Sequence, residues 1–245
     1  LRFSGWHRYK ATATVTLIYQ GMPLSVEITQ GEVSGWLPEG RSLFRDKRIP
    51  RENLNGLQVA RTGFSAVVQT LTGVGSEWAQ DPPHYAEVVS FETGSDVDRV
   101  HLRLSDWRGW THDRIVHLYR GGGPIAVVDR AVGPSGRQSA ILWHLVGRKS
   151  SSGSAVLVGD ARVEDYVGSL RILDLQKPDR QAKWVRRSNV LVDCSVHGRS
   201  GITAATVFLP GGWADAHLDY DINRQILAID RGDQIIMLPV SMDRP

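Results

Sequence analysis

Residues 111–147 constrain the fold more than any other stretch, because glycine and proline divide them into three short apolar runs. The runs cover residues 115–119, 125–131 and 139–145, and the breaks between them are GGGP at 121–124 and GPSG at 133–136. Glycine supplies positive φ and proline cannot donate to a β ladder, so such clusters end strands and begin turns. The spacing predicts an antiparallel meander in the middle of a large sheet.

The rest of the chain repeats this pattern of short β-type runs separated by turn residues. Further strands are expected at residues 11–19, 22–29, 57–70, 85–92, 97–104, 155–158, 170–175, 189–196, 202–209, 225–230 and 234–238. No apolar period of 3.6 residues continues for three turns, which argues against long helices. The sequence therefore predicts an all-β, two-layer, mostly antiparallel β-sandwich in a single domain of residues 1–245. A weak sub-boundary near residues 148–153 is the alternative.

Composition narrows the classes of function. The chain has 245 residues, a net charge of +3 and a pI near 9.2. Its cationic residues are mostly arginines, which suit an anionic ligand. The alternative is that the arginine content only reflects the base composition of the genome. No apolar run approaches a membrane span, and no recognition helix or RNA-binding signature is present, so neither a membrane span nor a nucleic-acid partner is expected. Cys194 is the single cysteine and is expected to be a half-buried strand thiol.

The central stretch also carries polar residues beside its apolar runs. His112 and Arg114 share one face of an extended strand, Asp129 lies in the next run, and His144 lies in the third. On neighbouring strands these four side chains would meet. Three interpretations are open: a site for acid/base chemistry or substrate binding, a metal site with His112, Asp129 and His144 as ligands, and a hydrogen-bond network that holds the sheet together.

The string THDRIVHLYRGGGPIAVVDRAVG, followed by LWHL, resembles the C-terminal β-sandwich of heparinase II/III-like polysaccharide lyases. That family often shows an H-x-R-x-V strand, a turn, an apolar strand that ends in Asp-Arg, and a strand that carries a histidine. Here the pattern falls on His112, Arg114, Asp129, Arg130 and His144. The segment TVFLP at 206–210 and the later strand QILAID are similar to the end of the family's sandwich.

The resemblance implies a carbon–oxygen lyase that cleaves an acidic, uronate-containing polysaccharide such as a glycosaminoglycan by β-elimination. It implies catalytic roles for His112 and His144. It also implies that this domain forms one wall of the substrate cleft, where carbohydrate binding would involve Arg114, His84, Tyr85 and Trp110. No cofactor is required, with a divalent metal as the alternative. A secreted, periplasmic or cell-surface location is expected, and homo-oligomerisation through exposed edge strands is a further expectation.

Two departures from the family pattern matter, and the second favours a different function. Full members carry an N-terminal α/α toroid, of which this sequence contains none, and the resemblance implies that a toroid in the full-length protein supplies a catalytic tyrosine. The family's opening strand of the type Ala-His-Asn-Thr-Val is matched here by residues 11–15, with Thr12 and Ala13 at the His and Asn positions and His7 as the nearest substitute. The second hypothesis is therefore a non-catalytic sandwich for glycan binding or structural assembly.

Overall fold

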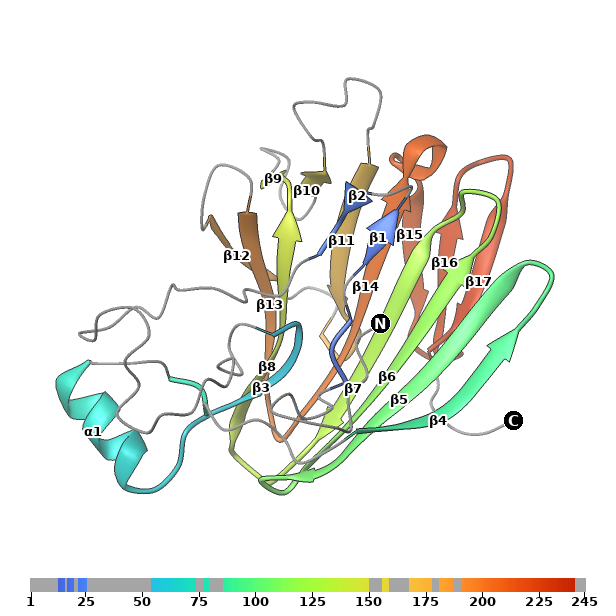
Figure 1. The fold of residues 1–245 in the computed structure, drawn as a ribbon. Helices are drawn as coiled ribbons and strands as arrows, with labels where there is room; N and C mark the ends of the chain where they lie inside the picture. Colours follow the sequence, from blue (N-terminus) through green and yellow to red (C-terminus); the bar gives the residue numbers. More distant parts are fainter. Residues whose placement is uncertain are drawn as a thin grey trace.

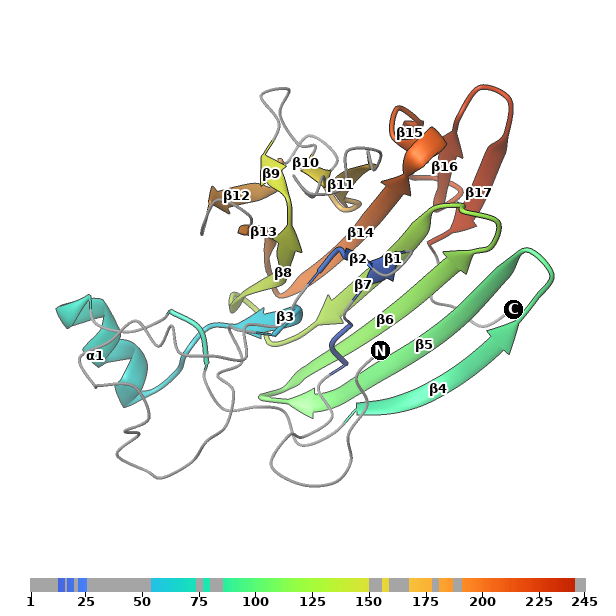
Figure 2. The same cartoon turned by 45° about the horizontal axis from the view of Figure 1, so that its top comes forward.

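A computed structural model describes residues 13–15, 17–19, 22–25, 54–73, 77–79, 86–149, 156–158, 168–177, 181–186 and 191–240. These residues form mostly β-sheet, and all of their strand pairings are antiparallel (Figures 1 and 2). Two large sheets pack face to face, which confirms the predicted all-β sandwich.

The larger sheet has eight strands in the order β4-β5-β6-β7-β14-β11-β10-β9. Their bounds are β4 Ala86–Thr93, β5 Val97–Trp107, β6 Trp110–Tyr119, β7 Ile125–Val132, β14 Gly201–Pro210, β11 Gly168–Asp174, β10 Val156–Val158 and β9 Arg148–Lys149. Strands from before and after residues 148–153 thus belong to one sheet. The division of the chain into domains otherwise remains a prediction.

Three smaller sheets and short helical segments complete the described residues. The four-stranded sheet has the order β12-β13-β8-β3, with β12 Lys183–Arg186, β13 Leu191–Arg199, β8 Gln138–Val146 and β3 Gly56–Val59. The other elements are β15 His217–Asp221, β16 Ile226–Asp230, β17 Ile235–Pro239, the pair β1 Ile18–Tyr19 and β2 Met22–Pro23, the helix α1 Phe64–Thr72 and a 3-10 helix at Gly211–Trp213. No helix among the described residues is both long and apolar enough to cross a membrane.

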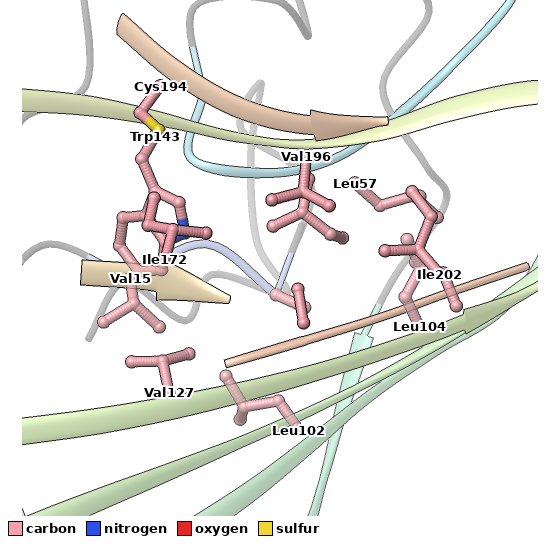
Figure 3. Packing of buried hydrophobic residues seen from close by; sticks show 14 of the residues in the cluster. Val15, Leu57, Leu102, Leu104, Val127, Trp143, Ile172, Cys194, Val196 and Ile202 are labelled. Carbon is pink, nitrogen blue, oxygen red and sulfur yellow. The ribbon is translucent and has the colours of Figure 1, made fainter. Parts of the chain in front are cut away.

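The main core lies between the eight-stranded and four-stranded sheets. Alternate residues of each strand face inward, as the period of two requires. Figure 3 shows Trp143, Cys194 and Val196 of the four-stranded sheet pointing toward Val127 and Leu102 of the larger sheet. Cys194 is fully buried rather than half-buried, and burial together with the nearby Asp193 charge raises the pKa of its thiol well above the usual value.

A second core lies on the outer face of the large sheet. There β15, β16 and β17 form a three-stranded sheet whose buried side chains include Leu227 and Leu238. These pack with Val128 of β7 and Val207 of β14. The middle of the large sheet is consequently buried on both faces, which accounts for the unbroken apolar run in β7.

The predicted three-strand meander is correct for β6 and β7 and wrong for β8. β6 pairs with β7, but β8 crosses to the other layer, where it pairs with β13 and β3, and β14 takes the place beside β7. The connection leaves β7 at Gly133, where a Cβ atom would overlap the ring of Trp110. Glycine therefore lets the backbone pass closely over that ring before it enters the second sheet.

The predicted strand at residues 57–70 is correct only in its first part. β3 ends at Val59, and after Gly63, whose φ is 68°, the chain forms α1. The apolar residues of α1 are Phe64, Val67, Val68 and Leu71, which follow the i, i+3, i+4, i+7 spacing of one helical face. The helix ends at Gly73, which adopts the left-handed conformation.

Candidate functional site

Arg114 and Asp129 form the centre of a polar cluster between the two large sheets. They are cross-strand partners on β6 and β7, and both side chains are fully buried. The Arg114 Nε donates to Asp129 Oδ1 at 2.7 Å and Nη2 donates to Oδ2 at 3.1 Å, which is a bidentate ion pair. The sequence prediction that these side chains meet is confirmed.

His112 completes the carboxylate's surroundings. It lies two residues before Arg114 on the same face of β6, and its Nε2 donates to Asp129 Oδ1 at 2.7 Å. Burial alone would raise the pKa of Asp129, but the Arg114 charge and the His112 hydrogen bond outweigh it and lower the pKa to about 2. The carboxylate is therefore ionised at neutral pH and compensated within the cluster.

The remaining Arg114 contacts tie this cluster to the rest of the core. Its Nη1 donates to the carbonyl oxygens of Ala13 at 3.1 Å and Asn55 at 3.3 Å, and its guanidinium carbon lies 4.8 Å from the ring centroid of Trp143. Ala13 has a φ of 51°, which is uncommon for a residue with a Cβ atom. With these contacts the Arg114 donors face protein groups, and the side chain is not exposed to a ligand in solution.

His144 lies apart from His112, Arg114 and Asp129. Alternation along β8 directs it away from Trp143, whose ring faces Arg114, and toward the outer face of the four-stranded sheet. Its Nδ1 donates to Asp193 Oδ1 at 2.8 Å, and Asp193 is its cross-strand partner on β13. His144 is fully buried, whereas the Asp193 side chain is 15% exposed. The four predicted residues therefore form two groups. His112, Arg114 and Asp129 lie on the core side of β8, and His144 lies on its outer side.

Asn55 links the two groups and was not predicted. Its Oδ1 accepts the backbone N–H of His144 at 2.7 Å, its Nδ2 donates to the carbonyl of Val15 at 3.2 Å, and its own carbonyl accepts from Arg114. Asn55 precedes Gly56, a sequence typical of an ordinary turn. Asp193 was also missed, although an acidic residue inside the apolar run NVLVDCSV was a usable signal.

The proposed metal ligands do not converge in this structure. Asp129 directs its oxygens to Arg114 and His112, and His144 faces the other side of β8. Within the described residues no group of three or more His, Cys, Asp or Glu side chains is arranged to hold a metal ion. His112, Asp129 and His144 therefore do not form a shared metal site in this structure.

Of the other predicted substrate contacts, one is buried in the core and two lie outside the described residues. Trp110 is fully buried, with its ring against Gly133, so it belongs to the core and not to a binding surface. His84 and Tyr85 lie outside the described residues, as do His7 and Thr12. Their roles remain predictions.

Comparisons with known proteins give a consistent match at the level of fold. No protein-family model and no curated protein matches the sequence. Among solved structures, a heparinase III gene product matches 96% of this chain at 12% identity and a TM-score of 0.60. A second heparinase III structure matches 90% at 11% identity and 0.58, and the heparan sulfate lyase HepC from Pedobacter heparinus matches 95% at 13% identity and 0.59. The chain covers only 37%, 34% and 37% of those three proteins.

Proposed function

We propose that this chain is the β-sandwich part of a polysaccharide lyase that acts on an acidic, uronate-containing polysaccharide. The observation that carries the proposal is the match of nearly the whole chain to one region of heparinase III and heparan sulfate lyase structures. The sandwich would form one wall of the cleft, and a helical toroid in a longer polypeptide would supply the remaining groups, including a tyrosine. A secreted, periplasmic or cell-surface location belongs to the same proposal.

The chemistry would be β-elimination beside a uronate carboxylate. A base removes the proton on the carbon next to the carboxylate, and the glycosidic oxygen leaves from the neighbouring carbon. Arg114 and His112 are fully buried and bonded to Asp129, so they stabilise the wall and do not neutralise a substrate charge. His144 is also fully buried, but its partner Asp193 is 15% exposed, whereas Asp129 is fully buried, so the His144–Asp193 pair is the better candidate for proton transfer.

His144→Ala and Asp193→Asn test this proposal in the longest native form of the protein. Turnover of heparan sulfate is followed by the ultraviolet absorbance of unsaturated uronate products. We expect His144→Ala to lower kcat by about 10²–10⁴-fold, as for loss of a general acid or base. His217→Ala, on the exposed strand β15, is the matched control and should leave kcat unchanged. Equal activity of His144→Ala and the control in folded protein would overturn the catalytic assignment.

A non-catalytic sandwich for glycan binding or assembly is the second candidate. It is favoured by the complete burial of His112, Arg114 and His144, which sets all three away from solvent in this chain. The same substrates separate the two functions. Glycan binding without any unsaturated product, in a native polypeptide whose intact mass has been measured, would support the non-catalytic role.

A further inference from the structure

The outward face of β13 carries a row of polar side chains, of which the proposed chemistry uses only Asp193. Asp193, Ser195 and His197 are partly exposed and alternate with the buried residues Cys194 and Val196. We infer that this row, together with Trp78 and Lys183, is a binding site for an acidic oligosaccharide chain that runs along β13. The inference rests on the proposed function and adds a specific contact surface to it.

The polar atoms of the row are held in fixed positions. Ser195 Oγ and His197 Nε2 lie 2.9 Å apart, within hydrogen-bond distance, and the Asp193 carboxylate accepts from His144 at 2.8 Å. Each side chain is thus oriented by a neighbour before any ligand arrives. Fixed polar groups lower the entropic cost of binding, because fewer rotamers are lost when a sugar hydroxyl takes its place among them.

Trp78 provides an aromatic surface at one end of the row. Its ring centroid lies 5.7 Å from that of His197, with the planes tilted by 43°, and the residue is partly exposed. Its backbone is held by a bridge to Ala60 and by the hydrogen bond that Arg61 donates to its carbonyl. A rigid, partly exposed indole beside hydroxyl and imidazole groups suits the apolar C–H face of a sugar ring, with the polar neighbours set to contact its hydroxyls.

Lys183 supplies positive charge on the opposite side of the row. It is exposed on the edge strand β12 and is the cross-strand partner of Ser195, so both side chains point to the same face. Asp193 is the acidic member, and it already bonds to His144. The ammonium group of Lys183 therefore favours a ligand that carries carboxylate or sulfate groups over a neutral one.

The spacing of the row indicates a chain as the ligand and not a single sugar. Asp193 and His197 are four strand positions apart, which is about 13 Å at the usual rise per residue. Trp78 lies beside His197 at one end of the row, and Lys183 lies beside its middle. The aromatic and cationic contacts would thus reach different units of one oligosaccharide.

The test is calorimetric titration of the 245-residue chain with a heparan sulfate octasaccharide and with a neutral glucan oligosaccharide of the same length. We expect binding of the acidic ligand only. Trp78→Ala should weaken it at least tenfold, Ser195→Ala and Lys183→Ala about three- to tenfold, and Lys183→Ala should also reduce its salt dependence. The matched controls are Phe91→Ala and Lys177→Ala, an exposed aromatic residue and an exposed lysine on other elements, and both should bind as the wild type does.

Three results would overturn the inference: no binding by the wild-type chain, equal binding of the two ligands, or equal affinity of the row variants and the controls. Ser195→Ala and Lys183→Ala remove no fully buried side chain, so they keep the test valid if Trp78→Ala does not fold. Turnover in the longest native protein is measured separately. Lyase activity without binding at this row contradicts only the inference, whereas binding at the row without activity contradicts only the proposed lyase function.

Discussion

Arg114 and Asp129 are both excluded from solvent, so each charge depends on the other for compensation. A buried ion pair of this kind gives little net stability relative to apolar residues, but removal of one partner leaves an uncompensated charge in the core. The Arg114 guanidinium donates four hydrogen bonds, two to Asp129 oxygens and two to backbone carbonyls. The cluster therefore fixes the relative position of β6, β7 and the segments that contain Ala13 and Asn55.

Asp129→Asn should destabilise the protein strongly while keeping nearly the same shape. We expect a loss of about 3–5 kcal/mol in the free energy of unfolding, because Arg114 stays buried without its counter-charge. Urea denaturation at neutral pH measures the loss. Asp98→Asn is the control: Asp98 pairs with Arg120 at the surface, where water and salt screen the pair, so its loss should change stability far less. Similar losses in the two variants would contradict the proposed role of the buried pair.

His117 makes the folding stability of the protein depend on pH. Burial, assisted by the Arg99 charge, lowers its pKa from 6.5 to about 4. The unfolded chain therefore takes up a proton below pH 6.5 while the folded protein does not, so folding stability falls as the pH drops from 6.5 toward 4. The loss for this one group is about 3 kcal/mol. The low pKa of Asp129 acts in a lower window, between about pH 4 and 2.

His117→Phe should remove the stability loss between pH 6.5 and 4, because no imidazole remains to be protonated. Thermal or urea unfolding of the wild type and the variant at several pH values in this window measures the difference. His217→Phe, which replaces an exposed histidine on β15, is the matched control and should keep the wild-type slope. An unchanged slope in His117→Phe would show that other groups cause the acid sensitivity.

Local sequence predicted part of the polar cluster and not its full membership. The spacing of His112 and Arg114 fixed their shared face, and the short turn at 121–124 fixed the register with Asp129. The residues around His144 do not indicate which sheet its strand joins, because that depends on pairing with β13 and β3, which are distant in sequence. Asn55 was missed for the same reason, since its three partners come from distant segments.

At the scale of elements, α1 was the least predictable feature. Its nine residues contain β-branched and aromatic side chains, and the preceding run does form a strand, so local preference favoured a longer strand. The apolar residues nevertheless repeat at helical spacing over two turns. The strands β4 and β5 were predicted close to their bounds, since alternation and tight turns specify hairpins locally, whereas β6 begins at Trp110, five residues before the predicted run at 115–119.

The apolar face of α1 contributes little to the stability of the chain. Phe64 and Leu71 are 84% and 79% exposed, so neither buries much surface in the folded protein. Phe64→Gln combined with Leu71→Gln should change the free energy of unfolding by no more than about 0.5 kcal/mol. Leu104→Ala, in the main core, should by contrast cost about 2–5 kcal/mol. A loss above about 1 kcal/mol in the double variant would show that this face is covered in solution.

At the scale of the whole molecule, the sequence predicted two layers. The structure adds a third layer, the small sheet of β15, β16 and β17, which covers the outer face of the eight-stranded sheet. The signal for this layer was present in β7, where residues 125–129 are buried without alternation. A strand with both faces covered lacks the period of two that marks a simple sandwich strand. The covering strands β16 and β17 were predicted as strands, but their position depended on tertiary packing with β7 and β14.

The pairing of β7 with β14 has a consequence for biosynthesis. Val132 lies beside Gly201, so all of residues 133–200 must be made before the large sheet can close at this edge. Strands β4 to β7 can form early as a local meander, but β7 then presents an unpaired, apolar edge during translation. The nascent chain passes through a stage in which aggregation competes with folding, and slower synthesis of residues 133–200 or a bound chaperone would shift that competition.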